Sequence, residues 1–172
     1  MKPVLKRQYH ASLAMLGDAI QRCPDDVWAA SGHTNQFWQI AYHALYFTHM
    51  YLQQNEAAFR PWKHHDGDNQ YPDGIPGPSD PNSSLPLLPK PYTKAQLVDY
   101  WKFCDQMIDA AVDSLDLERP ECGFSWYQMS KLEHQFVSIR HIQHHAAQLA
   151  DRLRSAANIG IEWVGGDERI SA

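Results

Sequence analysis

The residues best suited to carry chemistry are histidines that gather in one short segment near the end of the chain. The chain has ten histidines, and three of them, His141, His144 and His145, lie close together. On a helix, His141 and His145 differ by about 40° around the axis and about 6 Å along it, so both imidazoles can bind one metal ion. His141 and His144, about 60° apart, form the alternative pair. The spacing therefore predicts a two-histidine metal clamp.

A stable metal site needs a further ligand from another part of the chain. Residues 35–56 contain His43 and His49. On a helix their side chains point about 120° apart, so at most one of them can face a given site. Periodicity does not choose between them. His64 and His65, in the loop that follows, are further candidates.

Three other residues of the same C-terminal segment are candidates for supporting roles. His144 is a candidate catalytic residue that orients a ligand or transfers a proton, and Gln148 is a candidate that hydrogen-bonds a bound group. His134 lies about 10.5 Å from His141 along the helix axis, too far to share an ion. We expect His134 beside the site or on the surface.

Three imidazoles favour transition-metal chemistry. Neutral imidazole suits zinc or nickel, with iron(II) as a further option, and three histidine ligands leave a position open for water or substrate. Such an ion lowers the pKa of bound water toward 7 or stabilises a thiolate. The sequence has no Glu-x-x-His pair and no His-Glu-x-x-His motif, which argues against di-iron carboxylate and zinc-protease sites.

Four amphipathic helices are expected to position these residues. Apolar side chains recur at three- and four-residue steps in residues 4–22, 35–56, 93–117 and from 125–130 to about 156. Thr93 with Gln96 and Ser130 with Glu133 are expected to form capping boxes at the last two helices. One of residues 33–35 is expected to cap the second helix. The pattern predicts an all-α four-helix bundle.

A long proline-rich connection separates the second and third helices. Residues 59–92 hold eight of the eleven prolines, a density that excludes regular structure. A connection of this length is usually a functional lid or a disordered linker. Its aromatic residues Phe59, Trp62, Tyr71 and Tyr92 favour a loop that packs onto the helices.

The remaining expectations concern the end of the chain and its overall organisation. Phe136 is expected on the apolar stripe of the fourth helix, and residues 157–172 are expected to form an extended tail held by Trp163. The length of 172 residues suits a single domain, residues 1–172.

Composition argues against several classes of partner. The net charge is −5 and the basic residues form no run, so no nucleic-acid partner is expected. No apolar stretch is long enough for a membrane span or a signal peptide, which predicts a cytoplasmic protein with no membrane partner. Cys23, Cys104 and Cys122 are widely spaced and are expected to be free thiols.

Two segments resemble a known family. The segment His141-x-x-His144-His145-x-x-Gln148-Leu149 resembles the signature of the DinB-like four-helix-bundle proteins, in which His-x-x-His-His-Arg-Gly-Gln-Leu is typical. Trp38-Gln39-Ile40-Ala41-Tyr42-His43 resembles the family's second-helix segment that carries a metal ligand. The resemblance covers all four helices and the connection. Ala146 and Ala147 replace the usual Arg-Gly, and the connection is longer and richer in proline.

This resemblance implies a metal site and a kind of activity. It implies His43, His141 and His145 as the metal ligands, which selects His43 over His49. It also implies a divalent-metal enzyme that uses a low-molecular-weight thiol as an S-transferase or isomerase on a small-molecule substrate, and that forms a homodimer. A second hypothesis is a non-catalytic stress-response or binding module with a structural metal. A third is a metal-dependent hydrolase.

Overall fold

The computed structural model describes residues 1–67, 69–71 and 91–166, and these residues contain helices and no β-strand. The elements are α1 (Lys2–Arg22), α2 (Asp25–Trp28), α3 (Phe37–Tyr51), the 3-10 helix η1 (Glu56–Ala58), α4 (Lys94–Ser114) and α5 (Lys131–Ala157). The predicted all-α class is confirmed. The short helix α2 was not expected, and the helix predicted for residues 35–56 ends at Tyr51.

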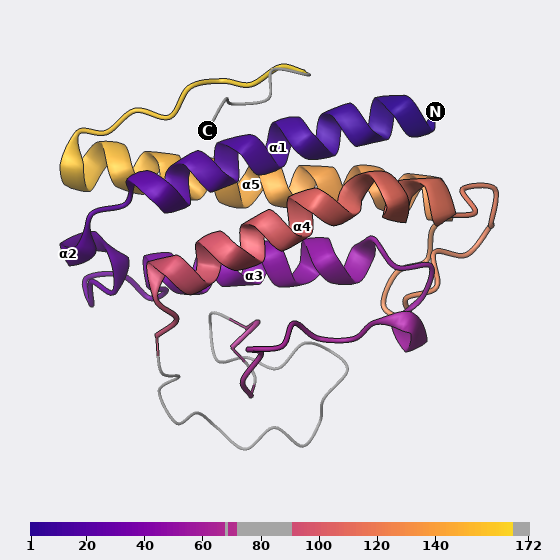
Figure 1. The fold of residues 1–172 in the computed structure, drawn as a ribbon, viewed down its shortest axis with the longest axis horizontal. Helices are drawn as coiled ribbons and strands as arrows, with labels where there is room; N and C mark the ends of the chain where they lie inside the picture. The colour runs from indigo at the N-terminus through magenta and orange to yellow at the C-terminus, as the bar shows by residue number, and fades with distance from the viewer. Residues whose placement is uncertain (68, 72–90, 167–172) are drawn as a thin grey trace.

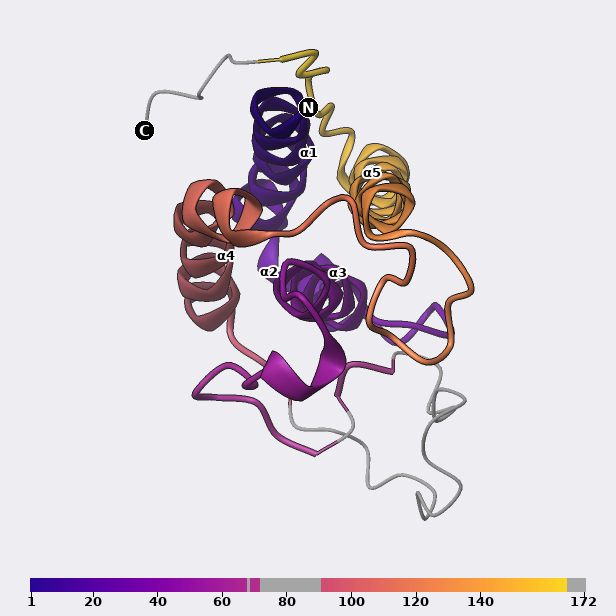
Figure 2. The same cartoon turned by 90° about the vertical axis from the view of Figure 1, so that its right-hand side faces the viewer.

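The four long helices lie side by side around a shared apolar core (Figures 1 and 2). Both α1 and α3 pack against α4 and α5, so α1 and α3 lie diagonally opposite each other. In Figure 1, α3 and α4 run in one direction, and α1 and α5 run in the other. The chain must therefore return along the molecule between α3 and α4, which explains why a long connection is needed there.

The apolar stripe of α1 forms one side of the core. Five of the residues that the periodicity predicted for this stripe are fully buried: Leu5, Tyr9, Leu13, Leu16 and Ile20. Trp101 of α4 lies so close to Gly17 of α1 that a Cβ atom there would overlap its indole ring. The indole Nε1–H donates to the Leu13 carbonyl at 2.7 Å. The missing side chain at Gly17 thus permits close contact between α1 and α4.

The first turns of α5 bury polar side chains, which the sequence pattern did not predict. Phe136 is 46% exposed, contrary to expectation, because it lies about 120° around the helix from the buried residue Ile142. Polar residues occupy the inner face instead: Lys131, His134, Gln135 and Ser138. Gln135 accepts a hydrogen bond from the Tyr9 hydroxyl at 2.9 Å and donates to the Tyr51 carbonyl at 3.3 Å.

Two helix caps follow the sequence signals to different degrees. Thr93 and Gln96 form the expected capping box at the start of α4. At the start of α5, the Ser130 hydroxyl accepts from the Glu133 N–H at 3.2 Å. The described residues show no reciprocal bond from the Glu133 side chain, so the second cap is one-sided.

The described part of the connection packs onto the helices. Phe59, Trp62 and Tyr92 are buried and Tyr71 is partly buried, as their aromatic character predicted. Trp62 stacks on Tyr100 of α4 with ring centroids 4.4 Å apart. Most prolines of the expected loop fall in residues 72–90, which lie outside the described residues.

The segment after α5 extends along the helices as far as residue 166, and the last six residues of the expected tail lie outside the described residues (Figure 1). Trp163 does not hold it, because its side chain is 74% exposed. Val164 is buried instead, and Ile159 and Ile161 pack against the core. The Arg22 guanidinium also donates to the Gly160 carbonyl at 2.6 Å.

The cysteines are three buried free thiols, Cys23, Cys104 and Cys122, as expected from their spacing. Within the described ranges, no helix has the length and apolar character needed to cross a bilayer.

Candidate metal centre

The first ligand-bearing helix begins later than expected. Gln36 is the N-cap residue of α3, in place of the predicted cap within residues 33–35. Its main-chain N–H is satisfied by the Gln39 side-chain oxygen at 2.7 Å. The helix places His43 on the flank that faces α5, where it meets His141.

Three imidazoles converge between α3 and α5. The Nε2 atom of His141 lies 2.9 Å from Nε2 of His43 and 3.1 Å from Nε2 of His145. Each residue offers one ligand atom, and these atoms all lie within 4.8 Å of one another, so the group could hold a metal ion. Tetrahedral zinc with bonds of about 2.05 Å separates its nitrogen ligands by about 3.3 Å, which is close to the two distances from His141 Nε2.

The tautomers of two imidazoles follow from the groups that contact their outer nitrogens. His43 Nδ1 lies 2.6 Å from the Gln70 carbonyl, and His145 Nδ1 lies 2.7 Å from Gln148 Oε1. Both oxygens can only accept, so each Nδ1 carries a proton and donates it. A neutral imidazole with a proton on Nδ1 has a lone pair on Nε2. His43 and His145 in this form therefore aim lone pairs at the space that they share with His141 Nε2.

Burial keeps two of these imidazoles neutral. Burial, followed by the neighbouring imidazoles of His43 and His145, lowers the pKa of His141 to about 2. Burial and His43 also lower the pKa of His145 to about 4, while the Gln148 hydrogen bond acts in the opposite direction. Both residues are therefore neutral near pH 7, which is the form that binds metal. His141 Nδ1 is buried and has no hydrogen-bond partner among the described residues.

Apolar and polar surfaces meet at this centre. The Phe47 ring packs against His43 and His141, with ring centroids 4.8 and 5.7 Å away. A cavity of about 610 Å³, called here the α3–α5 cavity, lies between residues 33–35, Ile40 and the last turns of α5. Gln148, which contacts His145, also lines this cavity. The centre therefore adjoins a space large enough for a small molecule.

The structure separates the other candidate histidines from this centre. His49 is buried on the opposite flank of α3, where its Nδ1 lies 3.2 Å from the Tyr100 hydroxyl. His65 Nδ1 lies 2.6 Å from the Tyr42 hydroxyl, and the His64 ring packs edge-on against Trp62. His134 is fully buried, which excludes the surface position, one of the two positions expected for it.

The two candidate catalytic residues, His144 and Gln148, lie at the outer edge of the centre. His144 is exposed, and its ring contacts that of His145 with centroids 5.0 Å apart. This position excludes it from the Nε2 cluster, so the alternative clamp with His141 does not form. Gln148, expected to hydrogen-bond a bound group, contacts His145 Nδ1 through its side-chain oxygen.

Sequence reasoning missed two contributors. Gln70 acts through its main-chain carbonyl, and no side-chain pattern signals such a role. Arg152 lines the α3–α5 cavity. It lies seven residues after His145, on the same helix face, so helical spacing could have identified it.

Comparison with known proteins adds no relative. No family model matches the chain, and no similar protein was found among curated proteins or solved structures. The interpretation of the centre therefore depends on its geometry.

Proposed function

We propose that this chain is a divalent-metal-dependent enzyme whose metal ligands are His43, His141 and His145. The observation that carries the proposal is the convergence of three Nε2 atoms, with the Nδ1 atoms of His43 and His145 held by oxygen acceptors. In metal sites, a ligating histidine almost always donates its other ring N–H to such an acceptor.

The donor set favours zinc or nickel, with iron(II) as a further option. An ion held by three neutral imidazoles keeps its full positive charge and supplies Lewis acidity, which lowers the pKa of a water or thiol ligand. The protein's own residues orient the ligand imidazoles and limit the access of water to the centre. Gln148 and the Gln70 carbonyl fix the ring orientations, and Phe47 excludes water from one side. His144, exposed beside His145, is placed to exchange protons with solvent.

We propose a thiol-dependent S-transferase or isomerase as the reaction class. The support is the resemblance of residues 38–43 and 141–149 to the DinB-like segments, together with four long helices of which α3 and α4 run in the same direction. On this proposal the helices form a DinB-like four-helix bundle with a proline-rich connection, and the protein is a homodimer.

Metal analysis of purified protein tests the ligand set. We expect about one equivalent of divalent metal in the wild type and loss of most of it in His145→Ala. His144→Ala is the matched control, since it removes a neighbouring imidazole outside the cluster and should retain the metal. Stoichiometric metal in His145→Ala would overturn the assignment.

The reaction class needs a separate experiment. Metal-loaded protein is incubated with a low-molecular-weight thiol and an electrophile, with and without chelator, and thiol consumption is followed. Metal-dependent consumption supports the transferase proposal. Ester hydrolysis without thiol would instead indicate a metal hydrolase. Stoichiometric metal that changes stability but supports neither reaction would favour the non-catalytic module.

A further inference from the structure

The face of α5 that carries two metal ligands continues as a line of polar residues. His141, His145, Gln148 and Arg152 all lie within about 60° of one another around the helix. The Cα atoms of His145 and Arg152 are about 10.5 Å apart along the axis. Arg152 is therefore on the same side of the helix as the three-histidine centre and about two turns from it.

The α3–α5 cavity is lined by this arginine and borders the centre through Gln148, although none of the three histidines lines it. Its wall includes Gln148, which contacts His145, and Ile40, which lies one turn before His43 on α3. Its far end is formed by residues 33–35 and Arg152. With a volume of about 610 Å³, it falls in the range of small-molecule pockets. A second cavity, of about 500 Å³ and lined by residues 120–129, includes neither Gln148 nor Arg152.

Arg152 supplies a partly buried positive charge at the far end of the cavity. Its Nη1 donates to the Asn35 main-chain carbonyl at 2.7 Å, which fixes the guanidinium in place. This is its one hydrogen bond to the described residues, and a guanidinium has five N–H donors. Asp151 also lines the cavity, but its side chain is exposed and its charge is screened by water.

We propose that the α3–α5 cavity binds the carboxylate end of a small molecule whose other end reaches the three-histidine centre, with Arg152 as the carboxylate-binding residue. A guanidinium presents paired N–H groups that match a carboxylate, and partial burial strengthens that contact. Asn35 and Thr34 add neutral hydrogen-bonding groups at the same end. This inference rests on the proposed metal centre for the position of the reacting end.

A matched pair of thiols tests the proposal. The protein is loaded with cobalt(II), and binding of 6-mercaptohexanoate and 6-mercaptohexanol is followed by the sulfur-to-cobalt absorption band. The two probes have the same six-carbon chain, and one ends in a carboxylate where the other ends in a neutral hydroxyl. We expect the carboxylate probe to bind the wild type about ten times more tightly, in line with one charge-assisted hydrogen-bond pair.

Variants then assign this preference to one residue. In Arg152→Gln the affinity ratio of the two probes should fall to about one. Arg154→Gln, which removes an equal charge from an exposed position two residues along α5, should keep the ratio. Asp151→Asn should raise it. Equal affinities in the wild type, or a preference that persists in Arg152→Gln, would overturn the proposal.

A metal-free arm separates this inference from the proposed function. Hexanoate is titrated into protein treated with chelator, and amide NMR shifts of residues 33–35 and 151–152 are compared with those caused by hexanol. Shifts that depend on Arg152 support the carboxylate site even if neither thiol binds the cobalt protein, a result that would count against the metal centre alone. Identical responses to both compounds would overturn the carboxylate site.

Discussion

At the three-histidine centre, the three imidazoles differ in the group that contacts the Nδ1 atom. His43 contacts a main-chain carbonyl, His145 contacts a side-chain amide, and His141 has a buried Nδ1 with no partner among the described residues. The side-chain contact to His145 is the one that a point mutation can remove cleanly. Gln148 is therefore the residue through which the orientation of a ligand can be tested.

We predict that Gln148→Ala weakens metal binding by about tenfold to a hundredfold, because loss of the acceptor frees the His145 ring and its tautomer. Competition with a chromophoric chelator measures this change. Gln148→Glu keeps an acceptor oxygen at the same reach and should retain or increase the affinity. Unchanged affinity in Gln148→Ala would show that this hydrogen bond does not orient the ligand.

At the scale of elements, a buried lysine joins the start of α5 to the end of α3. Lys131 is fully buried, and its ammonium group donates to the carbonyls of Gln53, Gln54 and Cys122 at 2.5, 3.0 and 3.1 Å. Two of these carbonyls follow the last turn of α3, where main-chain acceptors lack helical partners. The lysine thus satisfies the end of one helix from the beginning of another.

We predict that Lys131→Met lowers the free energy of unfolding by about 3 kcal/mol, because it leaves buried carbonyls without donors while keeping the apolar stem. Chemical denaturation measures the change. Lys102→Met, at an exposed position of α4, should change stability by less than about 0.5 kcal/mol. Equal effects of the two substitutions would contradict the role assigned to Lys131.

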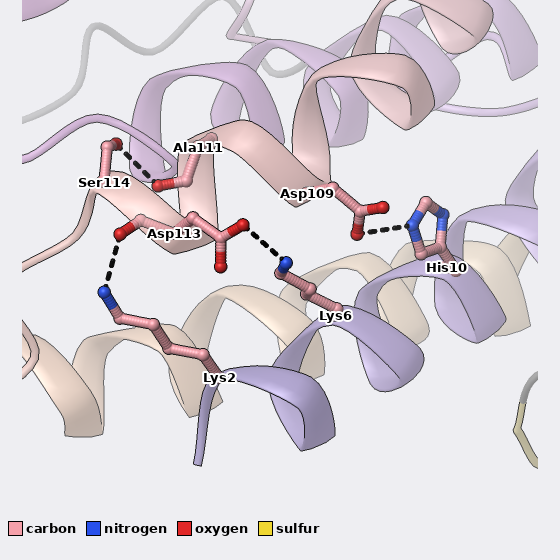
Figure 3. Close-up of polar contacts among 7 residues, drawn as sticks. All are labelled: Lys2, Lys6, His10, Asp109, Ala111, Asp113 and Ser114. Atoms are coloured by element: carbon pink, nitrogen blue, oxygen red, sulfur yellow. Dashed lines mark hydrogen bonds and ion pairs between the residues drawn. The ribbon is translucent and has the colours of Figure 1, made fainter.

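A second contact between elements depends on pH. Figure 3 shows polar side chains of α1 facing carboxylates of α4, including His10 beside Asp109 and Lys6 beside Asp113. His10 Nδ1 also lies 2.7 Å from Asp105. The hydrogen bond with Asp105 is the main cause that raises the pKa of His10, and burial opposes it. The folded state therefore holds this proton more tightly than the unfolded state.

We predict that this contact stabilises the protein at low pH and not at high pH. Its contribution is fully present below the unfolded pKa, about 6.5, and is lost as the pH rises through the higher folded pKa. Urea denaturation of the metal-free wild type and His10→Gln should show a stability difference between the two proteins that is larger at about pH 6 than at about pH 8. A difference that grows as the pH rises would contradict the sign of the shift.

At the scale of the whole molecule, the centre connects three parts of the chain. His43 belongs to α3, His141 and His145 belong to α5, and the Gln70 carbonyl belongs to the connection. An unfolded chain does not hold these groups together, so metal binding should favour the folded state. Folding and metal binding are therefore expected to be coupled.

We predict that a divalent metal at about 100 times its dissociation constant stabilises the protein by about 2.7 kcal/mol, which raises the melting temperature by about 5–10 °C. Thermal denaturation with zinc and with chelator measures the shift. His43→Ala should abolish most of the shift, whereas His64→Ala, on the connection, should keep it. A shift of wild-type size in His43→Ala would rule out a ligand from α3.

Helical spacing predicted a two-histidine clamp that includes His141, because residues three or four apart on one helix share a face, and it left His144 as the alternative to His145. The same rule predicted the all-α class and most of the apolar core, since burial follows a 3.6-residue period. It could not choose between His43 and His49, because both flank the same apolar face and only the packing of α3 against α5 and α4 separates them.

Other outcomes depended on contacts between distant segments. Phe136 and Trp163 are exposed although apolar, because Gln135 and Val164 occupy the buried positions nearby. The Gln70 carbonyl that contacts His43 Nδ1 also comes from a segment distant in the chain. The sequence by itself determined which residues share a helix face. Only the tertiary structure decided which faces meet, because that depends on packing between segments far apart in the chain.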